Sequence, residues 1–271
     1  MCMGNDEGTL TEKGASDKPG AFGKKVFFLN PPAVIGEVAM ALAEAEFEVY
    51  TTRDHGKLAR YFRKEHGSLT FINIDEGDDE SVWRKWMRSV RDDEECKDAA
   101  FGVITMLDDE EKRKNYLMNL GVECGFVVIK LGAAKTTEII LRTLEANEAR
   151  GRRRYVRAIC APDATECICA LDDETLRGWI RDLSSVGMSA AFSSDISPKP
   201  GTRLKNMQLN LKGVRIFLNG VIIGNHEAPG IGTVSIVMFE PGSINDDRRA
   251  KLRTFIRKTL QTTMDKALEL A

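Results

Sequence analysis

The chain has 271 residues, of which 42% are hydrophobic and 30% charged, a composition that excludes a disordered or fibrous protein. Its formal net charge of −2 gives the whole molecule no attraction for polyanions, so an anion site must be a local concentration of positive charge. No apolar run approaches the ~20 residues that span a bilayer, and residues 1–23 are polar, without a signal-peptide pattern. We therefore expect a cytoplasmic protein of two domains with a flexible tail over residues 1–23 and no membrane insertion.

Residues 24–148 predict an α/β domain. Short apolar runs, typical of strands buried on both faces, alternate with helical patterns. The strand runs are 24–29, 47–51, 69–74, 101–106 and 126–131, and the helical patterns are 34–45, 56–65, 79–91, 108–120 and 135–149. Repeated β–α units predict a doubly wound, five-stranded parallel sheet covered by helices on both sides.

Residues 149–271 predict a second domain of a different class. From Tyr155 the apolar period falls to two, and turn residues separate the alternating runs. Three such runs are Met207, Leu209, Leu211; Val214, Ile216, Leu218; and Val234, Ile236, Met238. Several short alternating strands predict a small antiparallel β-barrel. An amphipathic helix from Ile244 to about Leu270 follows, and its apolar stripe is expected to be core or an interface.

The cysteines and histidines predict neither a metal site nor a catalytic one. The six cysteines contain no C-x-x-C, and the three histidines are scattered and lack a serine or cysteine partner at catalytic spacing. We expect buried free thiols in a reducing compartment, no metal, no cofactor and no enzymatic activity. The cysteines are Cys2, Cys96, Cys124, Cys160, Cys167 and Cys169.

The segment 150–157 holds five arginines among its eight residues, in a chain that is otherwise slightly acidic. Guanidinium groups bind phosphate as planar forks, stack on flat rings and pair with the O6/N7 edge of guanine. The cluster therefore suits a ligand that carries both phosphates and guanines. A solvated interdomain linker is the alternative.

A second polar element, Asp182-x-Ser184-x-x-Gly187, lies between the predicted strands 175–180 and 188–192. Asp182 can accept hydrogen bonds from guanine N1 and N2. Ser184 can donate to a phosphate or hold the turn, and Gly187 allows a positive φ or a close backbone approach. An Asx-turn in a hairpin is the alternative.

Taken together, Arg153-x-x-x-Arg157 before the first barrel strand and Asp182-x-Ser184-x-x-Gly187 further along resemble the PilZ domain family of cyclic di-GMP receptors. The resemblance runs from about residue 150 to the C-terminus. It implies that Arg153 and Arg157 grip guanine and phosphate. It also implies that Asp182 and Ser184 face guanine and phosphate, and that Gly187 is the turn glycine.

Two further arginines extend the implied ligand site. Arg154 stands at a position that is often arginine in the family. Arg152 would stack on a second, intercalated cyclic di-GMP, which favours two ligands per domain over one. The resemblance implies a receptor that changes its interdomain arrangement on binding and signals to a downstream protein in motility, chemotaxis or the biofilm transition.

The first domain resembles response-regulator receiver domains. Asp75 stands where a receiver carries its phosphorylated aspartate, with Thr105 and Lys130 at positions similar to the receiver Thr and Lys. However, Asn30-Pro31-Pro32 replaces the acidic pair that holds Mg²⁺ for phosphoryl transfer, and Lys130-Leu131 replaces a Lys–Pro step. We expect a phosphorylation-silent pseudo-receiver used for docking or dimerisation.

Two other function classes remain as alternatives. One is a nucleic-acid-binding barrel, disfavoured because a pI near 6.0 and 7% aromatic residues leave little for base stacking or a phosphate track. The other is a phosphorylation-responsive two-domain regulator, weakened by the missing acidic pair. The downstream partner, the affinity and the oligomeric state are not encoded in any motif, and a homodimer stays open.

Overall fold

The computed structural model describes residues 23–96, 98–151, 153–171, 174–193 and 198–271, so the predicted tail lies outside them except for Gly23. In these residues the first domain is a five-stranded parallel sheet in the order β2-β1-β3-β4-β5. The strands are β1 (Lys25–Leu29), β2 (Val49–Thr52), β3 (Ser68–Asn73), β4 (Ala99–Thr105) and β5 (Phe126–Val128). This is the doubly wound sheet expected from the repeated β–α units.

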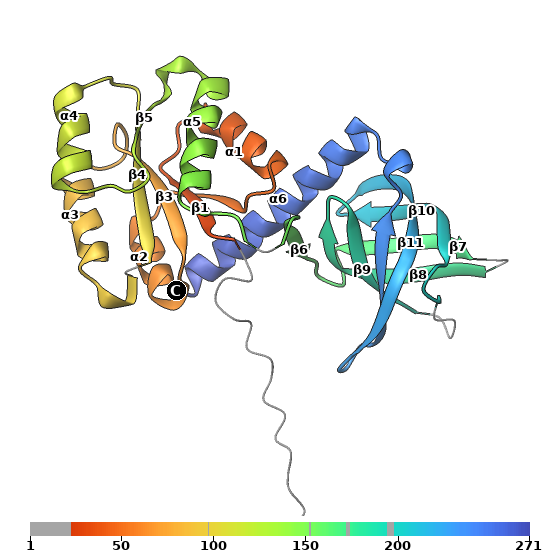
Figure 1. The fold of residues 1–271 in the computed structure, drawn as a ribbon. Helices are drawn as coiled ribbons and strands as arrows, with labels where there is room; N and C mark the ends of the chain where they lie inside the picture. The colour runs from red at the N-terminus through yellow and green to blue at the C-terminus, as the bar shows by residue number, and fades with distance from the viewer. Residues whose placement is uncertain (1–22, 97, 152, 172–173, 194–197) are drawn as a thin grey trace, which may run out of the picture.

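Helices cover both faces of this sheet, as Figure 1 shows. Phe27 and Phe28 are adjacent in β1 and fully buried, and they point into opposite cores because successive strand side chains alternate. Phe28 packs in the core beneath α1 and α5, whereas Phe27 packs beneath α2 and α3. The helices are α1 (Ile35–Glu44), α2 (His55–Lys64), α3 (Glu80–Arg91), α4 (Glu110–Lys114) and α5 (Ala133–Ala146).

The predicted helix 108–120 takes a different form from the one expected. It begins at Glu110, where the Asp109 carboxylate accepts from the backbone N–H of Lys112 at 3.0 Å and caps the helix. After α4 it widens into the π-helical turn η2 (Asn115–Asn119).

The second domain is an antiparallel barrel. In the described residues six strands form a ring in the order β8-β7-β10-β11-β12-β9, and the pairing of β8 with β9 closes it. A seventh strand, β6, pairs with the end of β8. The strands are β6 (Arg157–Ile159), β7 (Thr165–Leu171), β8 (Glu174–Ser184), β9 (Gly187–Phe192), β10 (Arg203–Leu211), β11 (Val214–Ala228) and β12 (Gly232–Phe239). Alternate side chains of these strands fill the barrel, as the period of two predicted.

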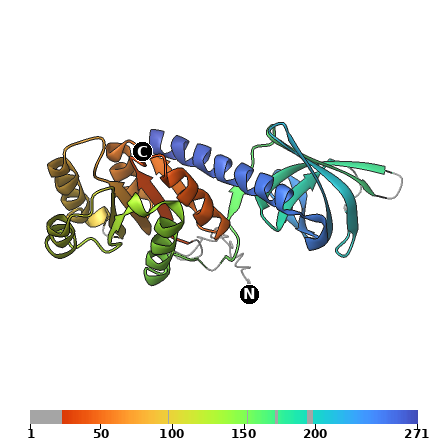
Figure 2. The same cartoon turned by 90° about the horizontal axis from the view of Figure 1, so that it is seen from above.

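The terminal helix α6 (Asp246–Glu269) belongs to both domains. Its 24 residues span about 36 Å and run from the barrel to the α/β domain (Figures 1 and 2). Near its start Leu252 and Phe255 pack in the barrel core, and near its end Met264 and Leu268 pack in the core beneath α2 and α3. The apolar stripe is therefore core at one end and a domain interface at the other.

Helix α6 also covers the open edge of the parallel sheet. The edge strand β2 leaves backbone groups unpaired on its outer side, and Gln261 pairs with both groups of Thr51. The Thr51 N–H donates to Gln261 Oε1 at 3.0 Å, and Gln261 Nε2 donates to the Thr51 carbonyl at 2.9 Å. The Gln261 side chain thus satisfies both backbone groups of Thr51 and attaches α6 to the edge of the sheet.

The five described cysteines are buried free thiols, as expected; Cys2 lies outside the described residues. Among the described helices, none combines the length and apolar character needed to cross a membrane. In the same part of the chain, no three His, Cys, Asp or Glu side chains gather in a way that could hold a metal ion.

Candidate ligand-binding site

The arginine segment lies where the two domains meet. It connects α5 to β6 and lines a cavity of about 310 Å³. Arg153, Arg154 and Arg157 line the cavity from the segment, and Glu46 and Glu48 line it from the first domain. The cavity therefore brings arginines and carboxylates to a common space.

Strand pairing brings the two predicted motifs together. Arg157 stands opposite Ser184 in the β6–β8 ladder, and Ile159 stands opposite Asp182. The Arg157 Nη1 atom lies 3.4 Å from Asp182 Oδ1, and half of the arginine side chain is exposed. An exposed pair of this kind contributes only ~0–1 kcal/mol, so either partner can exchange it for a ligand at little cost.

Asp182 is positioned by a residue that no motif indicated. The Ser189 hydroxyl of β9 donates to Asp182 Oδ2, and the two residues are direct neighbours in the β8–β9 ladder. One carboxylate oxygen is thereby held, while the other faces Arg157. The available signal was strand alternation, because Ser189 follows Gly187 by two residues and shares its face.

Ser184 and Gly187 shape the turn between β8 and β9. The strand β8 runs to Ser184 and β9 begins at Gly187, so the predicted strands 175–180 and 188–192 were too short and Asp182 lies within a strand. The Ser184 hydroxyl donates to the Gly187 carbonyl at 3.0 Å and accepts from its N–H at 3.1 Å. Ser184 is 4% exposed, so in this arrangement its hydroxyl holds the turn.

Gly187 is needed for a close approach of two strands. Its φ is not positive, but a Cβ at this position would lie 2.5 Å from the Val237 carbonyl oxygen of β12. Of the two reasons considered from the sequence, the structure supports the close backbone approach.

The other arginines of segment 150–157 lie against different groups. Arg154 lies over the Tyr155 ring at 5.4 Å, and Arg150 lies over the Phe47 ring of the first domain at 4.6 Å. Arg153 is exposed on the cavity. Arg152, proposed to stack on a second ligand, lies outside the described residues.

Two carboxylates of the first domain complete the cavity wall. Glu46 Oε2 accepts from the Val156 N–H at 3.0 Å, and Glu46 Oε1 accepts from the Ser185 hydroxyl at 2.8 Å. Burial raises the pKa of the Glu48 carboxyl above its ordinary value. The Tyr50 hydroxyl, which donates to Glu48 at 3.0 Å, and the charges of Lys25 and Arg153 act in the opposite direction. No sequence signal indicated these residues, because they stand more than 100 positions before the arginines.

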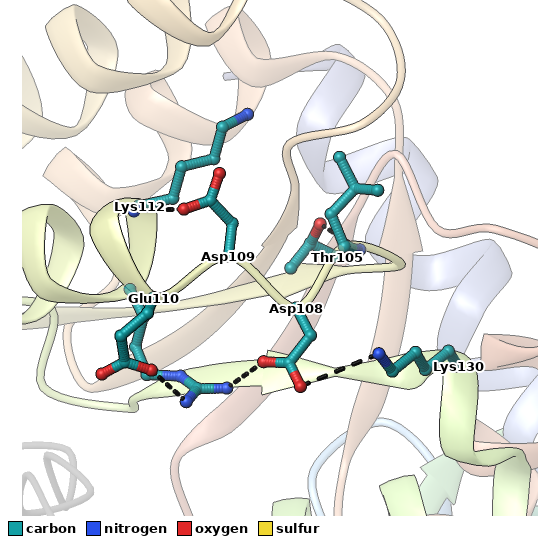
Figure 3. A network of polar contacts seen from close by, with 8 residues as sticks. Thr105, Asp108, Asp109, Glu110, Lys112 and Lys130 are labelled. Atoms are coloured by element: carbon teal, nitrogen blue, oxygen red, sulfur yellow. Dashed lines mark hydrogen bonds and ion pairs between the residues drawn. The ribbon is translucent and has the colours of Figure 1, made fainter.

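The receiver-like residues gather at the carboxyl edge of the parallel sheet, but they divide into two groups. Asp75, two residues beyond β3, accepts from the Thr105 hydroxyl at 2.6 Å and from the Met106 N–H at 2.6 Å. Lys130 instead pairs with Asp108 at 3.7 Å (Figure 3), and Asp108 also pairs with Arg113 at 2.7 Å. Thr105 thus contacts Asp75 directly, whereas Lys130 is paired with Asp108.

A larger open groove of about 990 Å³ lies on the barrel around Arg177, Trp179 and Lys212. None of the residues predicted for the ligand lines it. The smaller cavity at the domain junction, which Arg153, Arg154 and Arg157 line, is therefore the candidate site.

Comparisons with known proteins give matches among solved structures. No protein-family model matches the chain, and no curated protein sequence matches it. The PilZ domain of YcgR from Escherichia coli, solved with c-di-GMP, is 21% identical, with a TM-score of 0.36; the match covers 43% of this chain and 97% of that one. Escherichia coli YcgR in complex with c-di-GMP is 24% identical, with a TM-score of 0.39, and covers 45% of this chain and 52% of that one.

A second kind of match is the chemotaxis response regulator CheY4 of Vibrio cholerae. It is 19% identical, with a TM-score of 0.38, and the match covers 46% of this chain and 98% of that one.

Proposed function

We propose that the protein is a cyclic di-GMP receptor, a binding protein rather than an enzyme, whose ligand site is formed by Arg153, Arg157 and Asp182. The observation that carries this proposal is the contact between Arg157 and Asp182 across the β6–β8 ladder. It joins two motifs that are 25 residues apart in the chain into one site.

The chemistry of the proposed site matches the two parts of the ligand. Guanidinium forks of Arg153 and Arg157 bind phosphate oxygens and the O6/N7 edge of guanine. Asp182, oriented by Ser189, accepts from the N1 and N2 donors of guanine. Ser184 keeps the turn in shape beside them, and Arg154 adds positive charge.

Binding changes the angle between the domains and passes the signal on. The arginine segment is the covalent connection, and it also contacts the first domain through Val156 and Arg150. A ligand that draws the segment onto the barrel therefore shifts the population of interdomain arrangements. The output then reaches a downstream protein in motility, chemotaxis or the biofilm transition, with the first domain as a docking or dimerisation module.

Calorimetric titration of the full chain with cyclic di-GMP tests the proposal. The Escherichia coli PilZ domain that matches this chain was solved with c-di-GMP, so c-di-GMP is the first compound to titrate. Saturable binding, with GTP and single-stranded RNA inert under the same conditions, is the expected result. Binding of RNA without binding of cyclic di-GMP would establish the nucleic-acid alternative instead. The same titration reports whether one or two ligands bind per chain.

A further inference from the structure

The segment 46–48 of the first domain presents two carboxylates to the arginine segment. Glu46 and Glu48 flank Phe47 on the approach to β2, and all three line the cavity with Arg153 and Arg157. Phosphates of the proposed ligand need the same guanidinium groups. Two carboxylates therefore share a cavity with the guanidinium groups that the ligand phosphates would need.

Glu46 is held in a backbone conformation that another residue would adopt more easily. Its φ is 63°, and its N–H donates to the Ala43 carbonyl at 3.1 Å while the next N–H, of Phe47, donates to Leu42 at 3.1 Å. This pattern ends α1 as a Schellman motif, in which the left-handed position is usually glycine. A glutamate there costs about 1 kcal/mol of conformational energy relative to glycine, a cost that contacts of its side chain can offset.

The Glu46 side chain supplies a contact between domains. Its two oxygens accept from Val156, next to Arg157, and from Ser185, next to Ser184. The carboxylate thus bridges both motifs of the proposed site, although it belongs to the other domain. Any movement of the arginine segment toward a ligand has to lengthen or break the bond to Val156.

The cavity is small for the proposed ligand while this segment is in place. Its volume of about 310 Å³ lies at the lower limit of the roughly 300–1,000 Å³ typical of small-molecule sites. A cyclic dinucleotide with two purines, two riboses and two phosphates needs more room than that lower limit. The carboxylates therefore have to move away before the ligand is fully enclosed.

We propose that segment 46–48 is an internal competitor for the cyclic di-GMP site: Glu46 and Glu48 occupy the arginine segment in the free protein, and the ligand phosphates displace them. This inference rests on the proposed function and concerns how ligand binding at that site is regulated. Displacement removes the Glu46 bridge and so couples ligand binding to release of the first domain. With a competitor of this kind, the apparent affinity is the intrinsic affinity multiplied by the fraction of molecules in the open arrangement.

Charge-neutral variants test the competitor. Glu46→Gln and Glu48→Gln keep the size of the side chain but remove the charge, and Glu46→Gly also relieves the left-handed backbone, so it should fold at least as well. Glu37→Gln on the exposed side of α1 is the matched control. Titration with cyclic di-GMP should show an affinity roughly tenfold higher for the double Gln variant, which is about 1.4 kcal/mol. The control should bind like the unaltered protein.

X-ray scattering gives a readout that does not depend on affinity. Without ligand, the Glu46→Gly variant should scatter like the ligand-saturated unaltered protein, because both lack the bridge. Equal affinities in the unaltered protein and in the Glu46 and Glu48 variants would overturn the competitor and leave the receptor intact. Absence of binding in every variant would remove the receptor and the competitor together, whereas binding in the double variant alone would support both.

Discussion

Each domain presents one aspartate that accepts from a hydroxyl on the neighbouring strand, and the two differ in what their second oxygen does. Asp75 takes the Thr105 hydroxyl on one oxygen and the Met106 N–H on the other. Asp182 takes the Ser189 hydroxyl on one oxygen and faces a half-exposed arginine with the other. The Asp75 carboxylate is therefore held by a backbone and a side-chain donor of β4 and the residue after it. The Asp182 carboxylate is held on one side by Ser189 and on the other by Arg157, which is exposed enough to turn away.

This difference separates a structural carboxylate from an exchangeable one. Phosphoryl transfer to Asp75 would need a divalent cation, and Asn30-Pro31-Pro32 supplies no acidic pair for it. In the proposed site, Arg157 would turn from the Asp182 carboxylate to a ligand phosphate, a step that needs no divalent cation. Similar local geometry therefore supports different chemistry, because the surrounding charges differ.

Loss of both paired arginines should have the largest effect. Arg153→Ala and Arg157→Ala should each weaken cyclic di-GMP binding by ~1–3 kcal/mol, roughly tenfold to a hundredfold. The double variant should bind too weakly to saturate in calorimetry. Arg142→Ala, an exposed arginine of α5 outside the cavity, is the control. Unchanged affinity in both single variants would remove the site assignment.

Asp182→Ala should weaken binding to a similar or slightly smaller extent and change which base is accepted. Without the acceptor for guanine N1 and N2, the preference for cyclic di-GMP over cyclic di-AMP should fall by roughly tenfold or more, or about 1–3 kcal/mol. Competition between the two dinucleotides measures this. Asp163→Ala, exposed elsewhere on the barrel, should leave the preference unchanged. A retained preference in Asp182→Ala would show that guanine is read by another group.

Gly187→Ala should destabilise the barrel rather than change the charge of the site. The added Cβ would lie 2.5 Å from the Val237 carbonyl oxygen, so β9 and β12 must separate. We expect the free energy of unfolding in urea to fall by about 1–3 kcal/mol. Gly224→Ala is the matched control, because a Cβ there meets no atom within 4 Å. Equal stability of the two variants would contradict the close-approach explanation.

Gln261→Ala should detach α6 from the edge of the parallel sheet. The variant loses both hydrogen bonds to the Thr51 backbone, and we expect the free energy of unfolding, measured by thermal unfolding, to fall by about 1–2 kcal/mol. Hydrogen exchange of the Thr51 amide should accelerate. Thr262→Ala, whose hydroxyl donates only within α6, should change stability little. An unchanged exchange rate at Thr51 would show that the edge is protected by other contacts.

The smallest expected effect is that of phosphodonors on the first domain. Incubation with Mg²⁺ and acetyl phosphate should leave the protein mass unchanged, because the acidic pair after β1 is missing. Intact-protein mass spectrometry checks this directly. Acyl phosphate at Asp75 would make the first domain an active receiver and would erase the contrast between the two aspartates.

Much of the fold was predictable because it depends on local pattern. The five strands of the first domain were located as short apolar runs, the barrel strands by their period of two, and the terminal helix by its apolar stripe. The predictions were wrong where the end of a strand depends on pairing with another strand. For example, β8 extends to Ser184 because β6 pairs with its last residues. The division at residues 148 and 149 stays a prediction, and α6 packs on both sides of it.

The candidate site was predictable only in part. Arg157 and Asp182 were placed together by motif, but Ser189 and Glu46 entered through contacts that motif spacing does not encode. Ser189 stands within a hairpin of Asp182, so strand alternation could have found it. Glu46 lies 110 residues before Val156, and no local pattern connects them.

By itself, the sequence determined the alternation of apolar residues, the turn residues and the cluster of guanidinium charge, because each depends on residues near one another in the chain. Only the tertiary structure decided that β9 pairs with β12 to complete the barrel, that Gln261 covers the edge of β2 and that Glu46 reaches the arginine segment. These contacts join positions far apart in sequence, and their formation depends on how whole elements pack rather than on any period in the chain.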